Sequence, residues 1–248
     1  MSRVVLVSGG SRGIGKSCCV MMAKQGWKTA FTYLKNDTSA QHTIQQIQRA
    51  GGVAVGLRAD TSQEDEVKLA FDETLKTFGR LDAVVVNAGV VDQASTLADM
   101  SAKRLKNIFN INLFGSFLFA REAARILPHH VSDSGGSIVI VSSAASRLGA
   151  PFEYVDYASC KGALDTLTVG LSKELAGQNI RVNAVRPGMI ATEIHASGGQ
   201  HDRLERLSGA IPLGRAGEAD EVANAISWLC SDEASYCTGA ILDVSGGR

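Results

Sequence analysis

The sequence predicts an α/β fold in which a doubly wound parallel sheet of seven strands is flanked by helices. Short β-branched and apolar runs alternate with longer helical patterns, as in consecutive βαβ units. A glycine-rich turn at residues 8–15 lies between the first apolar run and the first helical pattern, as in many doubly wound sheets. The 248 residues suit one hydrophobic core, because single cores grow to roughly 250–300 residues. We therefore expect one domain over residues 1–248.

The predicted elements follow one another in a regular order. Strands are predicted at residues 4–8, 28–33, 53–57, 83–86, 137–141, 181–185 and 240–244. Helices are predicted at residues 14–25, 39–49, 103–127, 157–176 and 221–230. A further helix is expected to open at a capping box formed by Ser62 and Asp65 and to close near Gly79. Residues 188–217 interrupt the alternation and are expected to form an excursion from the sheet.

Composition excludes several classes of protein. Apolar residues make up 45% of the chain and charged residues 20%, which excludes a disordered chain and a coiled coil. Basic and acidic residues balance at 25 each without a basic run, so we expect no nucleic-acid partner. No run approaches the roughly 20 apolar residues of a membrane span, and the N-terminus does not resemble an export signal. Five cysteines without C-x-x-C spacing indicate neither a disulfide framework nor a metal site, so we expect a cytoplasmic location.

The segment at residues 104–120 is apolar on almost every side. A helix that packs on one face of a sheet does not need this pattern, so we expect a second cover, and a second subunit could supply it. Burial within one chain remains the alternative. The apolar members are Leu105, Ile108, Phe109, Ile111, Leu113, Phe117, Leu118 and Phe119.

The glycine turn predicts a phosphate site. Gly9, Gly13 and Gly15 follow the first strand and open the first helix, so backbone N–H groups can approach a pyrophosphate at the positive end of that helix. A carboxylate that binds the ribose 2′-hydroxyl of NAD would stand at the end of the second strand. The chain has the uncharged residues Thr32, Tyr33 and Leu34 there, followed by Lys35.

Charge near this turn bears on which dinucleotide binds. With Arg12 and Lys35 able to converge, the site favours the 2′-phosphate of NADP over NAD, because a cation attracts that phosphate. The alternative is that both cations are solvated surface charges.

Tyr157 and Lys161 lie four residues apart in a helical pattern, and therefore on one helix face. A nearby ammonium favours the phenolate and lowers the pKa of a tyrosine, which makes the phenol a usable acid or base. Ser143, at the end of the fifth strand, could hydrogen-bond a carbonyl oxygen and hold it against the phenol.

Together these residues resemble the short-chain dehydrogenase/reductase family over the whole chain. The family implies a single-domain, Rossmann-type sheet, a nicotinamide cofactor and hydride transfer through a Ser-Tyr-Lys site. By this resemblance Tyr157 is the acid or base, Ser143 orients the carbonyl, Lys161 also binds the nicotinamide ribose, and Asn112 holds a water in a proton relay. The implied cofactor-binding residues are Gly9, Ser11, Arg12, Gly13, Ile14, Gly15, Tyr33, Lys35, Asp60, Thr61, Asn87, Ala88, Gly89, Tyr157, Lys161, Pro187, Gly188, Ile190 and Thr192.

Two of the departures from the family pattern concern serines. Ser8 stands where the family usually has threonine, which keeps a hydroxyl. Ser143 precedes Tyr157 by 14 positions instead of the commoner 13, so Ser142 is an alternative catalytic serine and Ser146 a weaker one.

The residues that should face a substrate are mostly polar and favour a small polar carbonyl or alcohol. They are Val91, Asp92, Gln93, Ala145, Arg147, Glu153, Tyr154, Met189 and the loop through His195. Several segments are similar to bacterial members labelled as glucose dehydrogenases or uncharacterised oxidoreductases. The alternatives are a 3-oxoacyl thioester (acyl-carrier-protein) reductase and a non-catalytic NADP(H)-binding sensor. The family also implies a homotetramer.

Overall fold

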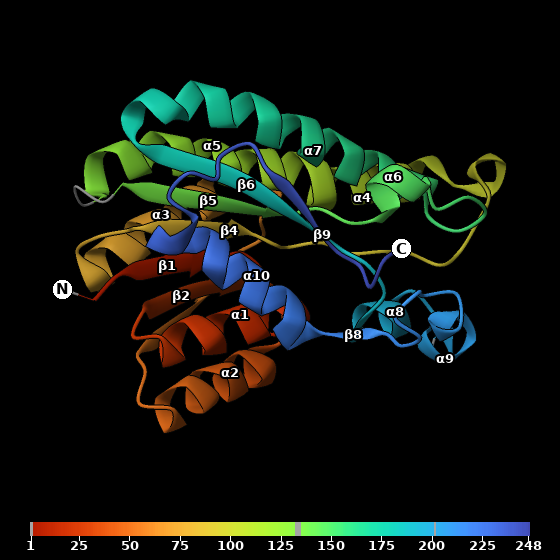
Figure 1. Cartoon of the computed structure of the whole chain (residues 1–248), viewed down its shortest axis with the longest axis horizontal. Coiled ribbons are helices and arrows are strands. Elements are labelled where there is room, and N and C mark those ends of the chain that lie inside the picture. The colour runs from red at the N-terminus through yellow and green to blue at the C-terminus, as the bar shows by residue number, and fades with distance from the viewer. Residues whose placement is uncertain (1, 132–134, 201) are drawn as a thin grey trace.

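A computed structural model describes residues 2–131, 135–200 and 202–248. Its centre is a parallel sheet of seven strands in the order β3-β2-β1-β4-β5-β6-β9 (Figure 1). This arrangement confirms the predicted fold class. The strands are β1 (Val4–Val7), β2 (Lys28–Tyr33), β3 (Ala54–Arg58), β4 (Ala83–Val86), β5 (Gly136–Val141), β6 (Ile180–Pro187) and β9 (Ile241–Val244).

The strand order reverses between β1 and β4, which pair directly although two strands separate them in the chain. At such a switch point the loops after neighbouring strands diverge to opposite faces and leave a crevice at the carboxyl edge of the sheet. The glycine turn follows β1 and the turn beginning at Asn87 follows β4. The topology therefore places both turns at one crevice.

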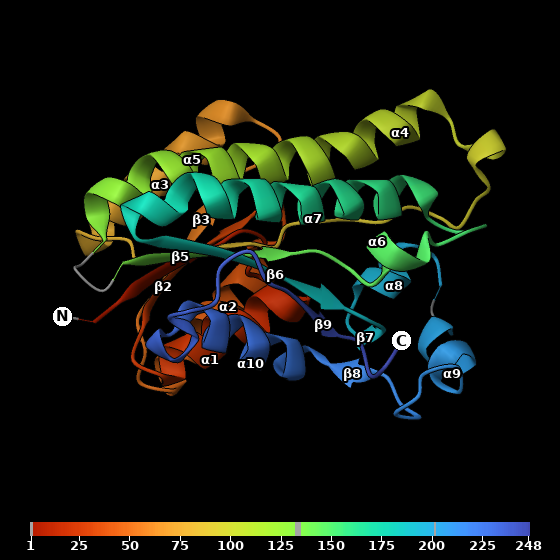
Figure 2. The same cartoon turned by 45° about the horizontal axis from the view of Figure 1, so that its top comes forward.

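Helices cover both faces of the sheet (Figures 1 and 2). One layer contains α1 (Gly13–Lys24), α2 (Asp37–Arg49) and α10 (Ala219–Cys230). The other contains α3 (Glu64–Phe78), α4 (Ala102–Phe109), α5 (Gly115–His130) and α7 (Val155–Leu175). Shorter helical segments are η1 (Leu97–Asp99), α6 (Ala145–Leu148), η3 (Ala176–Gln178) and η4 (Asp232–Ala234).

Two apolar cores lie between the layers because side chains along a strand alternate between the two faces. In β1, Val5 and Val7 belong to the core under α1 and α10, whereas Val4 and Leu6 belong to the core under α3, α5 and α7. All four residues are fully buried, as expected for a central strand of a parallel sheet.

The predicted capping box at Ser62 and Asp65 is wrong. Helix α3 begins at Glu64 without a side-chain hydrogen bond at its N-cap, and the Ser62 hydroxyl donates instead to Asp60 Oδ1 at 2.7 Å. The Ser62 hydroxyl is thus hydrogen-bonded to the Asp60 carboxylate and does not cap helix α3. A capping box is present in α10, where Glu218 and Glu221 form the reciprocal bonds.

The helix predicted at residues 103–127 is one helical run interrupted by a π-helical segment, η2, at Asn110–Phe114 between α4 and α5. The Asn112 side chain lies within this segment, and its Nδ2 donates to the Ile108 and Val90 carbonyls at 3.0 Å. A π-bulge of this kind is often found at a functional site.

The excursion at residues 188–217 contains regular structure of its own. Strands β7 (Ile190–Ala191) and β8 (Gly217–Glu218) form a two-stranded parallel sheet. Helices α8 (Ile194–Ser197) and α9 (Arg203–Ser208) follow β7 and precede β8 in the chain. They project at the carboxyl edge of the main sheet (Figure 1). Among the described residues, no helix has both the length and the apolar character needed to cross a membrane.

Candidate active site

A cavity of about 690 Å³ lies at the carboxyl edge of the sheet, within the range of roughly 300–1,000 Å³ usual for ligand sites. Of the residues predicted from the sequence to bind a cofactor or to catalyse, only Lys35 and Asn112 do not line it. The lining predicted residues are Gly9, Ser11, Arg12, Gly13, Ile14, Gly15, Tyr33, Asp60, Thr61, Asn87, Ala88, Gly89, Ser143, Tyr157, Lys161, Pro187, Gly188, Ile190 and Thr192.

The glycine turn at one wall of the cavity has the shape of a phosphate cradle. Gly9 and Gly13 have positive φ angles of 68° and 51°, which side chains disfavour. A Cβ on Gly15 would lie 2.3 Å from the Gly9 carbonyl oxygen, so only glycine fits there. The first turn of α1 contains no acidic residue, and its free N–H groups suit an anion. These residues fit a dinucleotide pyrophosphate.

At the carboxyl end of β2 the cavity is lined by the uncharged residues Thr32, Tyr33 and Leu34, and Arg12 from the glycine turn lines the same cavity. Lys35 is exposed and lies outside the lining. A cation missed in the sequence, Arg58 at the end of β3, donates from Nε to the Leu34 carbonyl at 3.2 Å.

One carboxylate lies close to this wall without lining it. A hydrogen bond from the Tyr33 hydroxyl to Asp37 raises the pKa of Tyr33. The Asp37 carboxylate therefore already accepts a hydrogen bond from the Tyr33 phenol.

The turn after β4 is held by Ser8. The Ser8 hydroxyl accepts hydrogen bonds from the backbone N–H groups of Asn87 at 2.8 Å and Ala88 at 3.0 Å. Asn87 returns a bond from Nδ2 to the Ser8 carbonyl at 2.9 Å. A serine thus supplies the hydroxyl that this turn requires.

Asn112 lies behind the same turn and is fully buried. Its Oδ1 accepts from Val90 N at 3.0 Å, and its Nδ2 donates to Val90 O at 3.0 Å. A Cβ on Gly89 would lie 2.8 Å from this amide oxygen. The side chain therefore anchors the turn, and its part in a proton relay stays a prediction.

Ser143, Tyr157 and Lys161 meet on the cavity wall. Ser143 follows β5, and its Oγ accepts a hydrogen bond from Ala145 N at 3.1 Å. Tyr157 lies in the first turn of α7, half-buried and facing the cavity. Lys161 Nζ lies 5.4 Å from the centroid of the Tyr157 ring and donates to the Val141 carbonyl at 2.7 Å.

Burial displaces both titratable groups. It raises the pKa of Tyr157 to about 12, against a hydrogen bond with Ser143 that acts to lower it. It lowers the pKa of Lys161 to about 8. The sequence led us to expect a tyrosine pKa lowered by Lys161. In the structure the pKa of Tyr157 is raised instead, because desolvation of the phenol is the largest effect on it and the Lys161 ammonium is directed at the Val141 carbonyl.

Ser142 and Ser146 do not share the position of Ser143. The buried Ser142 hydroxyl donates to the Lys161 carbonyl at 3.1 Å, and Ser146 does not line the cavity. The hydrogen bond that affects the pKa of Tyr157 comes from Ser143. The geometry therefore favours Ser143 among the three.

The remaining wall is formed by some of the residues expected to face a substrate. Val91, Ala145, Glu153, Tyr154 and Met189 line the cavity. Asp92, Gln93 and Arg147 do not, and the His195 side chain lies outside the described residues. Leu148, Pro151, Ile194, Arg203 and Arg248 also line the cavity, and Arg203 had no signal in the sequence.

A family model described as "Enoyl-(Acyl carrier protein) reductase" matches residues 9–248. The chain belongs to the short-chain dehydrogenase/reductase family. It is an oxidoreductase that acts on CH–OH or carbonyl groups of small molecules, and its family uses a nicotinamide cofactor.

Curated relatives in this family match the whole chain. The chain is 48% identical over 245 residues to the uncharacterized oxidoreductase YgfF of Escherichia coli (strain K12), with 99% of each chain covered. It is 33% identical over 246 residues to glucose 1-dehydrogenase 2 of Bacillus subtilis (strain 168), covering 99% of this chain and 94% of the relative.

A solved structure of the family shares the fold. The 3-ketoacyl-(acyl-carrier-protein) reductase from Brucella melitensis complexed with NADH matches with a TM-score of 0.91 and 28% identity, over 99% of this chain and 98% of that one.

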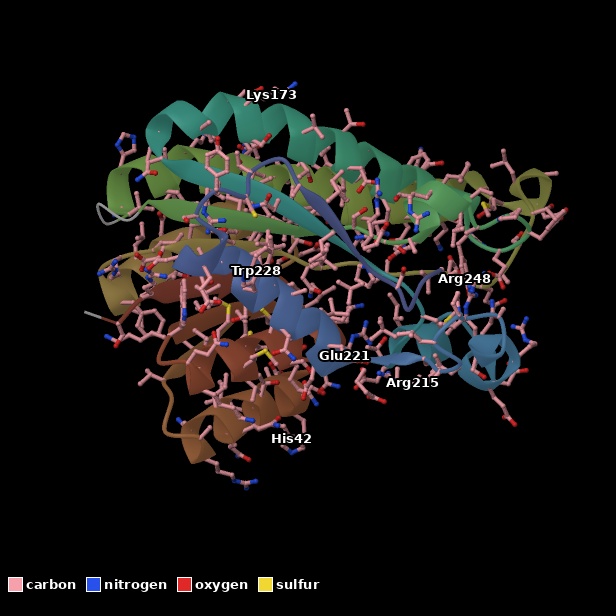
Figure 3. The ribbon with its side chains drawn as sticks, viewed as in Figure 1. His42, Lys173, Arg215, Glu221, Trp228 and Arg248 are labelled. Atoms are coloured by element: carbon pink, nitrogen blue, oxygen red, sulfur yellow. The ribbon has the colours of Figure 1, made fainter. Side chains whose placement is uncertain are left out.

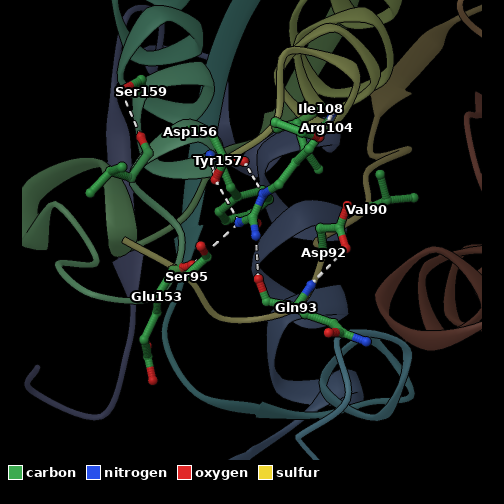
Figure 4. Close-up of polar contacts among 12 residues, drawn as sticks. Val90, Asp92, Gln93, Ser95, Arg104, Ile108, Glu153, Asp156, Tyr157 and Ser159 are labelled. Atoms are coloured by element: carbon green, nitrogen blue, oxygen red, sulfur yellow. Dashed lines mark hydrogen bonds and ion pairs between the residues drawn. The ribbon is translucent and has the colours of Figure 1, made fainter. Parts of the chain in front are cut away.

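This short-chain dehydrogenase/reductase also contains a buried ion pair next to Tyr157 that the sequence did not reveal (Figure 4). Arg104 on α4 donates from Nε to Asp156 Oδ2 at 2.8 Å, and the guanidinium also contacts the carbonyls of Gln93 and Glu153. Asp156 Oδ1 accepts from Tyr157 N at 2.9 Å. The pair therefore joins the start of α7 to α4 and to the segments that contain Gln93 and Glu153.

Proposed function

We propose that the protein is an NADP(H)-dependent oxidoreductase that transfers a hydride between the nicotinamide and a small polar carbonyl or alcohol substrate. The observation that carries this proposal is that Ser143, Tyr157 and Lys161 line the same cavity as the glycine turn. One cavity thus combines a phosphate cradle with a proton donor and a hydrogen-bonding hydroxyl.

Each group has a distinct role in this proposal. The bound nicotinamide supplies or accepts the hydride. Ser143 donates a hydrogen bond to the carbonyl oxygen and holds it against the Tyr157 phenol, which gives that oxygen its proton. Lys161 stabilises the phenolate that remains and binds the nicotinamide ribose. Asn112 fixes the turn that carries Gly89, next to the cofactor.

The preference for NADP is supported by charge. No carboxylate from the end of β2 lines the cavity, and Arg12 does. Arg58 adds a second cation beside Leu34. A 2′-phosphate would gain from both, whereas a 2′-hydroxyl would find no carboxylate acceptor on this wall.

A 3-oxoacyl thioester reductase is the second candidate, because the Brucella melitensis structure is that of a 3-ketoacyl-(acyl-carrier-protein) reductase. A carrier protein would require free basic groups for its acidic surface. Arg121 pairs with Glu64 at 2.7 Å, and Arg125 lies 3.6 Å from Glu122. These pairs reduce the positive surface near α5 and weigh against this candidate. A non-catalytic sensor would not need the three catalytic groups together.

The decisive experiment replaces Tyr157 by Phe. The variant should bind NADPH as the wild type does, because the ring keeps its packing, but turnover of a diketone and ketoester panel should fall at least about 100-fold without the proton donor. Nucleotide binding is followed by fluorescence and turnover by NADPH absorbance. A variant that keeps near-normal turnover would refute the assignment of Tyr157.

Two further properties belong to this proposal. We place the protein in the cytoplasm, which is supported by five free cysteines, four of them buried. We also propose that it assembles into a homotetramer. Phe109, Phe114 and Phe117 on the α4–α5 run are 42%, 50% and 43% exposed, and their burial between subunits would supply the second cover that this segment lacks.

A further inference from the structure

Arg203 on α9 lines the cavity, although it is only 8% exposed. Its Nη2 donates to Glu153 Oε2 at 2.6 Å, and its guanidinium carbon lies 4.9 Å from the centroid of the Tyr154 ring. Among the described residues, its Nε and Nη1 atoms are buried and have no hydrogen-bond partner. Within the described part of the chain, this guanidinium thus has two nitrogen atoms without a hydrogen-bond acceptor, and a hydrogen bond between Arg203 and the Tyr154 phenol acts to lower the pKa of Tyr154.

Unused donors of a buried cation are costly, because neither water nor protein replaces the lost hydration. When a residue with such donors lines a ligand cavity, an acceptor on the ligand can supply the missing partner. A guanidinium pairs best with a carboxylate or a phosphate, whose negative charge strengthens each N–H···O bond. Arg203 therefore points to an anionic group in the molecule that occupies this side of the cavity.

The charges around Arg203 favour the same conclusion. On this side the cavity is lined by the cations Arg203 and Arg248 and by one carboxylate, Glu153. Arg248 lies at the same end of the molecule as α8 and α9 (Figure 3). Glu193 belongs to the other side, since its Oε2 lies 3.7 Å from where a Cβ on Gly13 would stand. Among the described residues that line this side, two are arginines and one is a carboxylate.

The position of Arg203 relates this charge to the proposed chemistry. The guanidinium stacks on Tyr154, which is the N-cap residue of α7, three residues before Tyr157. The neighbouring lining residues Val91, Leu148 and Met189 are apolar and offer no hydrogen bonds to a polyol. An anion on Arg203 and a carbonyl at Tyr157 can belong to one small molecule.

We propose that Arg203 binds a carboxylate of the substrate, so that the protein interconverts oxo acids and the corresponding hydroxy acids. The proposal rests on the function proposed above and names its substrate class. In reduction, hydride from the nicotinamide adds to the carbonyl carbon and a proton from Tyr157 reaches the oxygen. The carboxylate takes no part in bond making and only fixes the orientation.

The test compares oxo acids with their methyl esters. 2-, 3-, 4- and 5-oxo acids are assayed beside the matching esters, with NADPH and with NADH, and the readout is the acid-to-ester ratio of kcat/KM. This ratio should exceed one for the wild type and fall about 10- to 100-fold in Arg203→Met, as expected for one charge-assisted contact. The Arg203→Lys variant should recover part of the ratio, because it keeps the charge.

Two further variants separate binding from a structural role. Arg206→Met changes an exposed arginine on the same helix, which contacts Gln200, and should leave the ratio unchanged. Glu153→Gln removes the competing carboxylate and should raise the ratio about threefold or more. If the Arg203–Glu153 pair only fastens α9 to the cavity wall, Arg203→Met and Glu153→Gln should each lower turnover of acids and esters by the same factor. That result would overturn the proposal.

The remaining outcomes are also distinct. Esters and neutral diketones reduced as well as the acids, with a ratio that Arg203→Met does not change, would overturn the carboxylate site and leave the oxidoreductase function intact. Failure of every carbonyl compound to oxidise either nucleotide, with nucleotide binding retained, would refute the proposed function and the carboxylate site with it.

Discussion

At the scale of single residues, burial leaves Tyr157 protonated and Lys161 near its point of titration at neutral pH. The pKa of Tyr157 is about 12 and that of Lys161 about 8. A tyrosine with this pKa is ready to donate a proton to a reduced carbonyl, whereas it rarely holds the phenolate needed to oxidise an alcohol. The resting site thus holds the proton that reduction of a carbonyl needs, and the charge of Lys161 decides how well the phenolate is tolerated.

The pH dependence should reflect both groups. Carbonyl reduction should be constant from about pH 6 to 7.5 and should decline with a midpoint near 8, because Lys161 loses its proton above its pKa. Alcohol oxidation should rise with pH between 6 and 8, since the phenolate fraction grows about tenfold per unit below the pKa of Tyr157.

The measurement is kcat/KM for the nucleotide, at a saturating concentration of the second substrate, in both directions. Lys161→Arg provides the control, because an arginine stays charged throughout this range. The decline near pH 8 should vanish in this variant even if its rate is low. A decline that persists in Lys161→Arg would assign the titration to another group.

Cofactor preference should depend on Arg12 and Arg58 more than on Lys35. Arg12 lines the cavity. Arg58 and Lys35 both lie outside the lining, but Arg58 is held at the Leu34 carbonyl and its charge acts on the lining residue Tyr33. Arg12→Ala and Arg58→Ala should each raise the KM for NADPH about tenfold and leave that for NADH nearly unchanged, as for loss of one phosphate contact. Lys35→Ala should change either KM less than about twofold.

Steady-state kinetics with both nucleotides check this prediction. The sequence led us to expect Lys35 beside the phosphate, so Lys35→Ala also tests that expectation. A collapse of the NADPH preference in Lys35→Ala alone would restore the original assignment and exclude the arginines.

At the scale of the elements, the Arg104–Asp156 pair fixes how α4, α7 and the segment around Gln93 meet. The two side chains are 9% and 1% exposed. Arg104→Met leaves the Asp156 carboxylate buried without its partner, which should lower the free energy of unfolding by about 3–5 kcal/mol. It should also lower kcat, because Asp156 binds the backbone of Tyr157.

Urea unfolding and turnover test this role. Lys76→Met, which removes one side of an exposed pair with Glu73, serves as the matched control and should unfold almost as the wild type does. In the double variant Arg104→Met/Asp156→Leu, stability should largely return while kcat stays low. A single Arg104→Met variant as stable as Lys76→Met would show that the pair does not hold these elements together.

The elements also show what the sequence could predict. The seven strands and their helices follow from local periodicity, and the glycine turn and the Tyr157–Lys161 spacing follow from short motifs. The break between α4 and α5 does not, because it depends on contacts of Asn112 with Val90, 22 residues away. The Arg203–Glu153 pair spans 50 residues and has no periodic or motif signal. Such contacts arise only from tertiary packing.

At the scale of the whole molecule, the exposed face of the α4–α5 run predicts self-association. The helical run lies beside α7 in one layer (Figure 2). Phe109, Phe114 and Phe117 are each at least 42% exposed, and contiguous exposed aromatic residues of this kind mark a subunit interface. We expect four chains of 26.1 kDa each in a closed symmetric assembly.

Light scattering at micromolar concentration tests the assembly. The wild type should have four times the mass of one chain, and its Tm should rise with protein concentration because association stabilises the folded state. Phe109→Asp/Phe117→Asp should lower the mass, since two charges would be buried per subunit. Val53→Asp, at a 52% exposed position just before the edge strand β3, introduces an aspartate outside this helical run and should keep the assembly intact. A monomeric wild type with a concentration-independent Tm would mean that the aromatic face stays in contact with solvent, and the second cover expected for this helix would then be absent.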